Sequence, residues 1–104
     1  MIRVAVMYPK TEDSHFDMAY YKETHMKLVQ DRLGDKGLIS VAVDNVVASG
    51  NPKYPPAYAA IGYLTFESLE AFQSGMGEHG REIMGDIPNF TNVRSEVLVS
   101  EIEM

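Results

Sequence analysis

The sequence predicts an α+β fold in which four strands and two helices follow one another in the order β-α-β-β-α-β. Four short apolar segments alternate their side chains between two faces, as half-buried strands do. Two longer segments carry apolar residues at helical spacing, and each begins next to a residue that can cap a helix. With 104 residues, the chain is expected to form a single domain, residues 1–104, that buries roughly two-thirds of its unfolded surface.

The first helix is expected within residues 15–34, and both of its ends carry signals. Asp17 can accept hydrogen bonds from the free N–H groups of the first turn. Phe16 and Tyr21 have the spacing of a hydrophobic staple. Gly34 follows the last apolar position, where a left-handed residue commonly ends a helix. The apolar face of this helix is made of Met18, Tyr21, His25, Leu28, Val29 and Arg32.

The four strands are expected at residues 2–8, 38–48, 58–66 and 93–102. In the second strand, alternation places Ile39, Val41 and Val43 on one face. In the third strand, alternation places Ile61 and Tyr63 opposite Leu64 and Phe66. Gly62 interrupts this third strand, and a glycine there often marks the close approach of another group.

The second helix is expected to begin after Ser68, a good capping residue, and to extend to about Met84. Gly75 and Gly77 lower the helix propensity in its middle, so a pause is expected there. A loop over residues 86–92 then leads into the last strand.

This element order is the ferredoxin-like arrangement, an antiparallel four-stranded sheet with two helices. Two helices cover one face of such a sheet, yet every strand carries apolar residues on both faces. Burying five or six of these side chains would contribute on the order of 10 kcal/mol to pairing. We therefore expect a homodimer in which the open sheet faces of two copies pack together. The alternative is a monomer with a partly apolar surface.

Composition excludes several classes of function. The net charge is −6, and no basic stripe is present that could neutralise nucleic-acid phosphates. The absence of cysteine excludes disulfides and thiolate chemistry. No signal peptide or membrane-spanning segment is recognisable, so we expect a cytoplasmic protein without a membrane partner.

The common cofactor and metal motifs are also missing. The three histidines, His15, His25 and His79, do not form a spaced ligand set. The glycine-rich segment 75–80 lacks the lysine of a phosphate-binding loop and does not follow a strand. We therefore expect neither a metal site nor a bound cofactor.

His25 and Tyr21 are the first candidates for chemistry, because residues four apart lie on the same side of a helix. An imidazole exchanges protons near neutral pH, and a phenol can orient a ring nitrogen or donate to a developing oxyanion. The alternative is a packed core histidine beside a packed tyrosine.

The loop before the last strand supplies further candidates. Asp86, Asn89, Phe90 and Thr91 lie where a loop can meet a cavity between sheet and helices. The alternative is ordinary turn chemistry with Phe90 filling the core. We expect Tyr63, Phe66 and Phe90 to supply apolar or stacking walls for a small hydrophobic ligand.

Two motifs resemble those of the EthD-like family, named for a protein linked to ethyl tert-butyl ether degradation. They are FDMAYY-x3-H-M-x-LV in the first helix and DIPNFTN before the last strand. The resemblance implies a ferredoxin-like fold that pairs into a dimeric α/β barrel, and members are often labelled oxidoreductases. Related barrels include cofactor-free monooxygenases, muconolactone isomerases and haem-degrading enzymes.

By this resemblance, the tyrosine pair of the family falls on Tyr20 and Tyr21, and the helix histidine falls on His25. Tyr20 thereby becomes a ligand-binding candidate, in addition to Asp86 from the loop before the last strand. The family often has a proline where this chain has Lys27. Lysine keeps the backbone donor that proline lacks, so we expect a regular helix at this point.

Three hypotheses follow. In the first, the protein is a cofactor-independent oxidoreductase or isomerase that acts on a small hydrophobic or aromatic metabolite, with His25 transferring the proton and Tyr21 as its partner. In the second, it is a non-catalytic binding or accessory dimer. In the third, it is a structural dimer in which His25 is packed.

Overall fold

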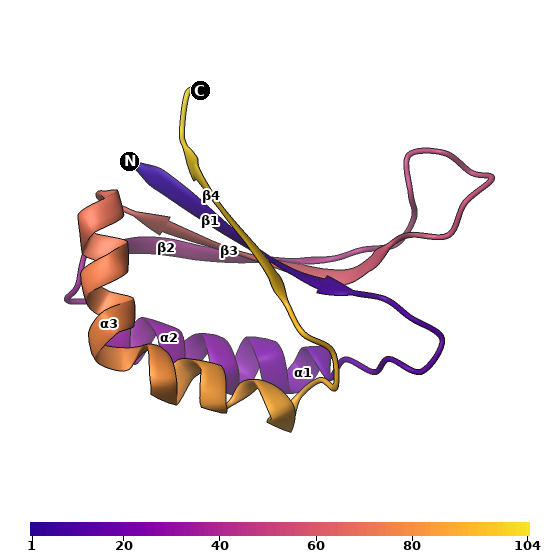
Figure 1. Cartoon of the computed structure of the whole chain (residues 1–104), viewed down its shortest axis with the longest axis horizontal. Coiled ribbons are helices and arrows are strands. Elements are labelled where there is room, and N and C mark those ends of the chain that lie inside the picture. The colour runs from indigo at the N-terminus through magenta and orange to yellow at the C-terminus, as the bar shows by residue number, and fades with distance from the viewer.

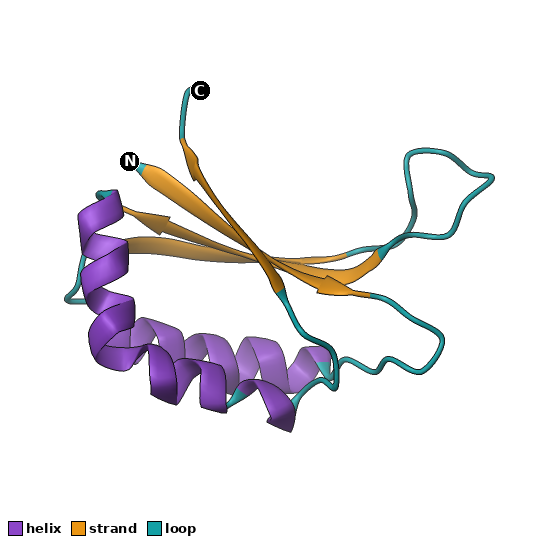
Figure 2. Cartoon of the chain, viewed as in Figure 1, coloured by secondary structure: helices purple, strands orange, loops and turns teal.

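The computed structural model describes all 104 residues as a four-stranded antiparallel sheet with two helices on one side (Figure 1). The strand order in the sheet is β2-β3-β1-β4. Figure 2 shows that the opposite side of the sheet carries no helix. The α+β class and the β-α-β-β-α-β order are confirmed. The elements are β1 (Ile2–Pro9), α1 (Met18–Tyr20), η1 (Tyr21–His25), α2 (Met26–Leu33), β2 (Leu38–Asn45), β3 (Tyr58–Phe66), α3 (Leu69–Gly85), η2 (Ile87–Asn89) and β4 (Glu96–Glu101).

The core lies between the sheet and the helices. Its buried hydrophobic residues are Ile2, Val4, Tyr8, Tyr21, Met26, Val29, Leu33, Ala60, Leu64, Phe66, Ile83 and Phe90. They come from the two central strands, the helices and the segment before β4, so one layer of side chains joins all of these elements. Its burial supplies the main favourable term for folding.

The first helix begins as its sequence predicts. Asp17 has an extended backbone, and its carboxylate accepts a hydrogen bond from the backbone N–H of Tyr20 at 3.1 Å. The rings of Phe16 and Tyr21 lie 5.0 Å apart between centroids, which completes the predicted staple.

The middle of this helix is not regular, which corrects the expectation drawn from Lys27. Residues Tyr21–His25 form a π-helical turn between α1 and α2, and the N–H of Met26 donates to the carbonyl of Tyr21, five residues earlier. Lys27 has the backbone N–H that proline lacks, but the widened π-helical turn lies just before it. Such turns in otherwise α-helical segments are frequent at functional sites.

The end of the first helix also differs from the prediction. Gly34 has φ −58°, a right-handed conformation, so it does not form the expected left-handed cap. The chain continues in turns to Gly37, which has φ +91° and leads directly into β2. The left-handed position that needs glycine is therefore three residues later than predicted.

A β-bulge changes the faces of β2. Leu38 pairs with Phe66 and Ser40 pairs with Thr65, so Ile39 is the extra residue between them. Leu38 packs on the core, whereas Ile39 is exposed. Simple alternation placed Ile39 with Val41 and Val43, and this was wrong because a bulge shifts the side-chain phase by one residue.

The second helix is continuous over Leu69–Gly85, so the expected pause is wrong. The Ser68 side chain caps it by accepting from the N–H of Ala71 at 3.1 Å. The axis of α3 changes direction along its length (Figure 1). Small residues such as Ser74 and Gly75 are a common cause of helix bends, which explains how this sequence bends without breaking the helix.

Two strands, β2 and β4, are shorter than predicted. β2 ends at Asn45 and β4 begins at Glu96, although apolar residues continue beyond both limits. Val47 is largely exposed, so its apolar character does not reflect membership of the sheet. No helix has the length and hydropathy needed to cross a bilayer.

Candidate functional site

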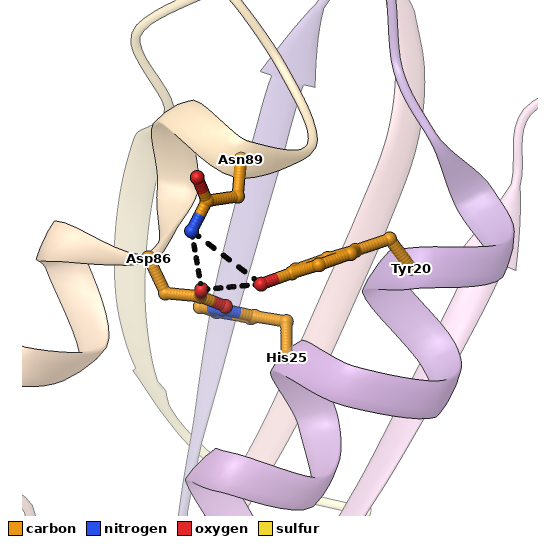
Figure 3. Close-up of polar contacts among 4 residues, drawn as sticks. All are labelled: Tyr20, His25, Asp86 and Asn89. Carbon is orange, nitrogen blue, oxygen red and sulfur yellow. Dashed lines mark hydrogen bonds and ion pairs between the residues drawn. The ribbon is translucent and has the colours of Figure 1, made fainter.

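Three donors converge on the Asp86 carboxylate (Figure 3). The Tyr20 hydroxyl donates to Oδ1 at 2.7 Å, and the Asn89 amide donates to the same oxygen at 2.9 Å. Nδ1 of His25 lies 2.9 Å from the other oxygen, Oδ2. The Asn89 amide also lies 3.4 Å from the Tyr20 hydroxyl oxygen. We call Tyr20, His25, Asp86 and Asn89 the polar cluster.

Two separate parts of the chain supply the polar cluster. Tyr20 and His25 come from the first helix, five residues apart: Tyr20 directly precedes the π-helical turn, and His25 is its last residue. A π turn matches a spacing of five residues, so both side chains reach the same carboxylate. Asp86 is the C-cap of α3, and Asn89 lies in the short helix η2 that follows.

His25 is held in an environment that favours its neutral form. Its side chain is 4% exposed. Burial lowers the pKa of His25, and the hydrogen bond and charge of Asp86 only partly oppose this effect. Because an ionised carboxylate accepts but does not donate, Nδ1 carries the proton and donates it to Oδ2. The other ring nitrogen, Nε2, then has a free lone pair, and no protein group forms a hydrogen bond with it.

Asp86 itself stays ionised. Partial burial tends to raise its pKa, but hydrogen bonds from Tyr20, Asn89 and His25 outweigh that effect and hold the pKa below its usual range. The same hydrogen bond to Asp86 raises the pKa of the Tyr20 hydroxyl, which therefore remains a donor. The cluster is a fixed negative charge surrounded by three donors.

A second group of rings, the aromatic cluster, packs directly beside the polar cluster. It consists of Tyr8, Phe16, Tyr21 and Phe90. The Tyr21 ring stacks on the His25 ring, with centroids 5.5 Å apart and planes 14° apart. Phe90 contacts the same imidazole, with centroids 4.7 Å apart. These contacts fix the orientation of the histidine ring.

Tyr21 does not hold a nitrogen of His25, although sequence analysis allowed that role. Its hydroxyl instead approaches the backbone of Gly62, where any side chain would collide with it. This confirms that Gly62 admits another group. Burial, followed by the effect of the Tyr8 hydroxyl, raises the pKa of Tyr21 far above its usual range. The phenol is therefore a protonated donor at neutral pH.

A narrow cavity of about 60 Å³ lies between the sheet and the helices. Of its 15 lining residues, 14 are hydrophobic, and His25 is the exception. Tyr8 and Tyr21 contribute to the wall on the side of the aromatic cluster. The cavity is therefore an apolar space with one proton-accepting side chain in its wall.

The structure separates the other predicted wall residues from this cavity. Tyr63 lies on the open face of the sheet, near Arg3 and Asp44, because alternation turns it away from the helices. Phe66 is fully buried and packs against Phe72 at 5.3 Å between ring centroids. Phe90 supports the His25 ring from within the core. None of the three lines the cavity.

The carboxylate partner of His25 was the residue that sequence spacing did not identify. Asp86 and His25 are 61 positions apart, so no local motif joins them. Asn89 was part of the loop group, but nothing in its spacing connected it with Tyr20. No set of three or more His, Cys, Asp or Glu side chains is arranged to hold a metal ion.

The fold and these motifs define a small ferredoxin-like α+β protein with an internal histidine site. The sequence profile of the EthD domain matches residues 9–94. The chain therefore belongs to the EthD family. An EthD-like protein from Ralstonia eutropha JMP134 is 39% identical, with a TM-score of 0.92, and the match covers 99% of this chain and 92% of that one.

More distant structures share the fold. An EthD family protein from Bacillus halodurans C-125 is 21% identical, with a TM-score of 0.74 and coverage of 98% of both chains. SnoaB from Streptomyces nogalater, described as a cofactor-independent oxygenase, is 8% identical over 99% of this chain and 92% of that one, with a TM-score of 0.63. Among curated proteins, none matches this chain significantly.

Proposed function

We propose that this protein is a cofactor-independent enzyme that removes a proton from a small, mostly apolar substrate, with His25 as the base. The observation that carries the proposal is the Asp86–His25 pair in the wall of an otherwise hydrophobic cavity. A buried neutral imidazole whose second nitrogen is fixed by a carboxylate has the features of a general base.

The side chains around the cavity have distinct roles in this reaction. Asp86 accepts a hydrogen bond from Nδ1–H and stabilises the imidazolium that forms when Nε2 takes a proton from the substrate. Tyr21 stacks on the imidazole and contributes to the cavity wall, so its ring orients the base. The apolar wall excludes water, which strengthens each of these interactions.

Two reaction types are compatible with this arrangement. In an isomerisation, His25 returns the proton to a different atom of the same substrate. In an oxidation, the substrate anion, an electron-rich aromatic or enolate, reacts directly with dioxygen. The second type is supported by the description of SnoaB, which shares the fold, as a cofactor-independent oxygenase.

Replacement of His25 by asparagine tests the proposal. We expect His25→Asn to abolish turnover in a panel of phenols, hydroquinones and cyclic ketones while ligand binding, followed by NMR, is retained. His79→Asn is the matched control, because His79 lies outside the polar cluster and the cavity. Equal activity of the two variants would contradict a catalytic role for His25.

Binding without turnover is the second candidate function. It is favoured by the apolar character of the cavity, whose hydrophobic walls suit ligand capture without chemistry. Under this alternative, His25→Asn weakens binding, and no member of the panel is converted by the unmodified protein.

We also propose that two copies pair through the open sheet face. Ile39 and Leu98 are 50% and 58% exposed, and Leu98 lies opposite Ala5 on that face. A ferredoxin-like protein from an uncultured marine organism is described as dimeric. We expect Leu98→Arg to produce monomers in sedimentation experiments, whereas Leu69→Arg, at the exposed start of α3, leaves the mass unchanged. A monomeric unmodified protein would contradict the proposal.

A further inference from the structure

A second hollow adjoins the histidine cavity. It has a volume of about 340 Å³ and lies between the end of α3, the segment after it and β4. Met84, Ile87 and Val97 line both spaces. Met84 and Val97 are 48% and 47% exposed, so this shared wall is also where the inner cavity approaches the surface. The two spaces therefore adjoin at these three residues.

The sizes of the two spaces constrain the ligand. The inner cavity, at about 60 Å³, is well below the roughly 150 Å³ that accommodates benzene in an engineered cavity. It therefore takes only the reacting end of a substrate next to His25. Any remaining part of the molecule lies outside this cavity, and the outer hollow adjoins it at Met84, Ile87 and Val97.

The outer hollow differs chemically from the inner one. Arg94 and Ser95 contribute polar side chains to its wall, beside the apolar Pro88 and Val93. Arg94 is exposed and forms no ion pair, whereas Lys27, Arg32 and Lys36 each pair with a carboxylate. The guanidinium of Arg94 is therefore free to bind an anionic group at the wall of the outer hollow.

We propose that the substrate is an amphipathic carboxylate whose apolar body extends from His25 to the outer hollow and whose carboxylate binds Arg94. This inference rests on the proposed use of the cavity and names its substrate class. The planar guanidinium presents two parallel N–H donors, which match the two oxygens of a carboxylate. The Ser95 hydroxyl adds a neutral donor in the same wall.

A pair of probes that differ only in charge tests the inference. Binding of hexanoate and of methyl hexanoate, whose narrow alkyl chain suits the inner cavity, is measured by isothermal titration calorimetry, with the unmodified protein, Arg94→Gln and Arg81→Gln. Arg81 is the matched control, because it is exposed, unpaired and outside both spaces. We expect the unmodified protein to favour the carboxylate about fivefold, the upper range for an exposed ion pair.

The expected result is that Arg94→Gln removes this preference, while Arg81→Gln keeps it and both variants bind the ester equally. If the ester and the carboxylate bind equally to the unmodified protein, or if the two arginine variants behave alike, the inference is overturned and the His25 proposal stands. If neither probe binds and His25 resonances do not shift with either, the use of the cavity itself is contradicted.

Discussion

Tyr20 and Tyr21 are neighbours in the sequence, yet their hydroxyl groups lie in opposite environments. Tyr20 reaches Asp86 in the half-buried polar cluster, whereas Tyr21 is 1% exposed and packs among aromatic rings against Gly62. The imidazole of His25 belongs to the polar cluster and also stacks on Tyr21 of the aromatic cluster. The aromatic cluster therefore stabilises the fold and orients the imidazole ring, whereas the polar cluster sets the protonation state of His25.

The largest expected loss of stability follows from removing one ring, Phe90, from the aromatic cluster. Phe90 is fully buried and contacts Tyr8, Phe16, Tyr21 and His25. We expect Phe90→Ala to lower the free energy of unfolding by about 3–5 kcal/mol, through lost burial and the cavity left behind. Urea denaturation measures this change, and Phe90→Leu should cost less. A loss below about 1 kcal/mol, small for a core site, would show that this cluster does not hold the fold.

A smaller loss of stability is expected when the negative charge of the polar cluster is removed. We expect Asp86→Asn to reduce stability by roughly 1–2 kcal/mol, because its partners lose a charged acceptor at a partly solvated site. The pKa of His25 should fall further, since the charge and hydrogen bond of Asp86 act to raise it. NMR titration measures the pKa and denaturation the stability. An unchanged pKa of His25 would show that Asp86 does not control its protonation.

A smaller effect distinguishes the two tyrosines. Tyr20→Phe deletes one donor to Asp86, so the pKa of the carboxyl should rise towards its ordinary value with little loss of stability. Tyr54→Phe is the control, because Tyr54 is exposed in a loop and its side chain forms no hydrogen bond. Carbon-detected NMR of Asp86 reports the change. The division between clusters fails if Tyr20→Phe destabilises the chain as much as Phe90→Ala.

Acidification should produce the smallest effect. Burial lowers the pKa of folded His25 below the ordinary value of about 6.5. As the pH falls below 6.5, the unfolded chain takes up a proton that the folded chain does not, so acidification favours unfolding. We expect thermal stability to decline from pH 7 towards pH 5, and His25→Asn to flatten this decline. An increase in thermal stability from pH 7 to pH 5 would contradict a lowered pKa for folded His25.

The sequence predicted the features that depend on neighbouring residues. The Asp17 cap, the Phe16–Tyr21 staple and the Ser68 cap are each set within five positions, and all three are confirmed. The close approach at Gly62 followed from the cost of a glycine within a strand. In each case the physical cause is local and can be recognised from a short segment.

The features it missed depend on residues far apart or on small changes of phase. Asp86 meets His25 only because α3 ends beside the first helix, which no local spacing encodes. The bulge at Ile39 shifts one strand by one residue. Tyr63 and Phe66 could not both line one cavity, since alternation separates them, and the structure places neither there.

The central claim is that His25 is a neutral base whose Nδ1 proton is held by Asp86. Nitrogen-15 NMR of the imidazole measures both the tautomer and the pKa directly. The account predicts the Nδ1–H tautomer at pH 7, a pKa below 6.5, and a shift of the Nε2 resonance when a ligand enters the cavity. An Nε2–H tautomer, or a pKa above 6.5, would contradict it.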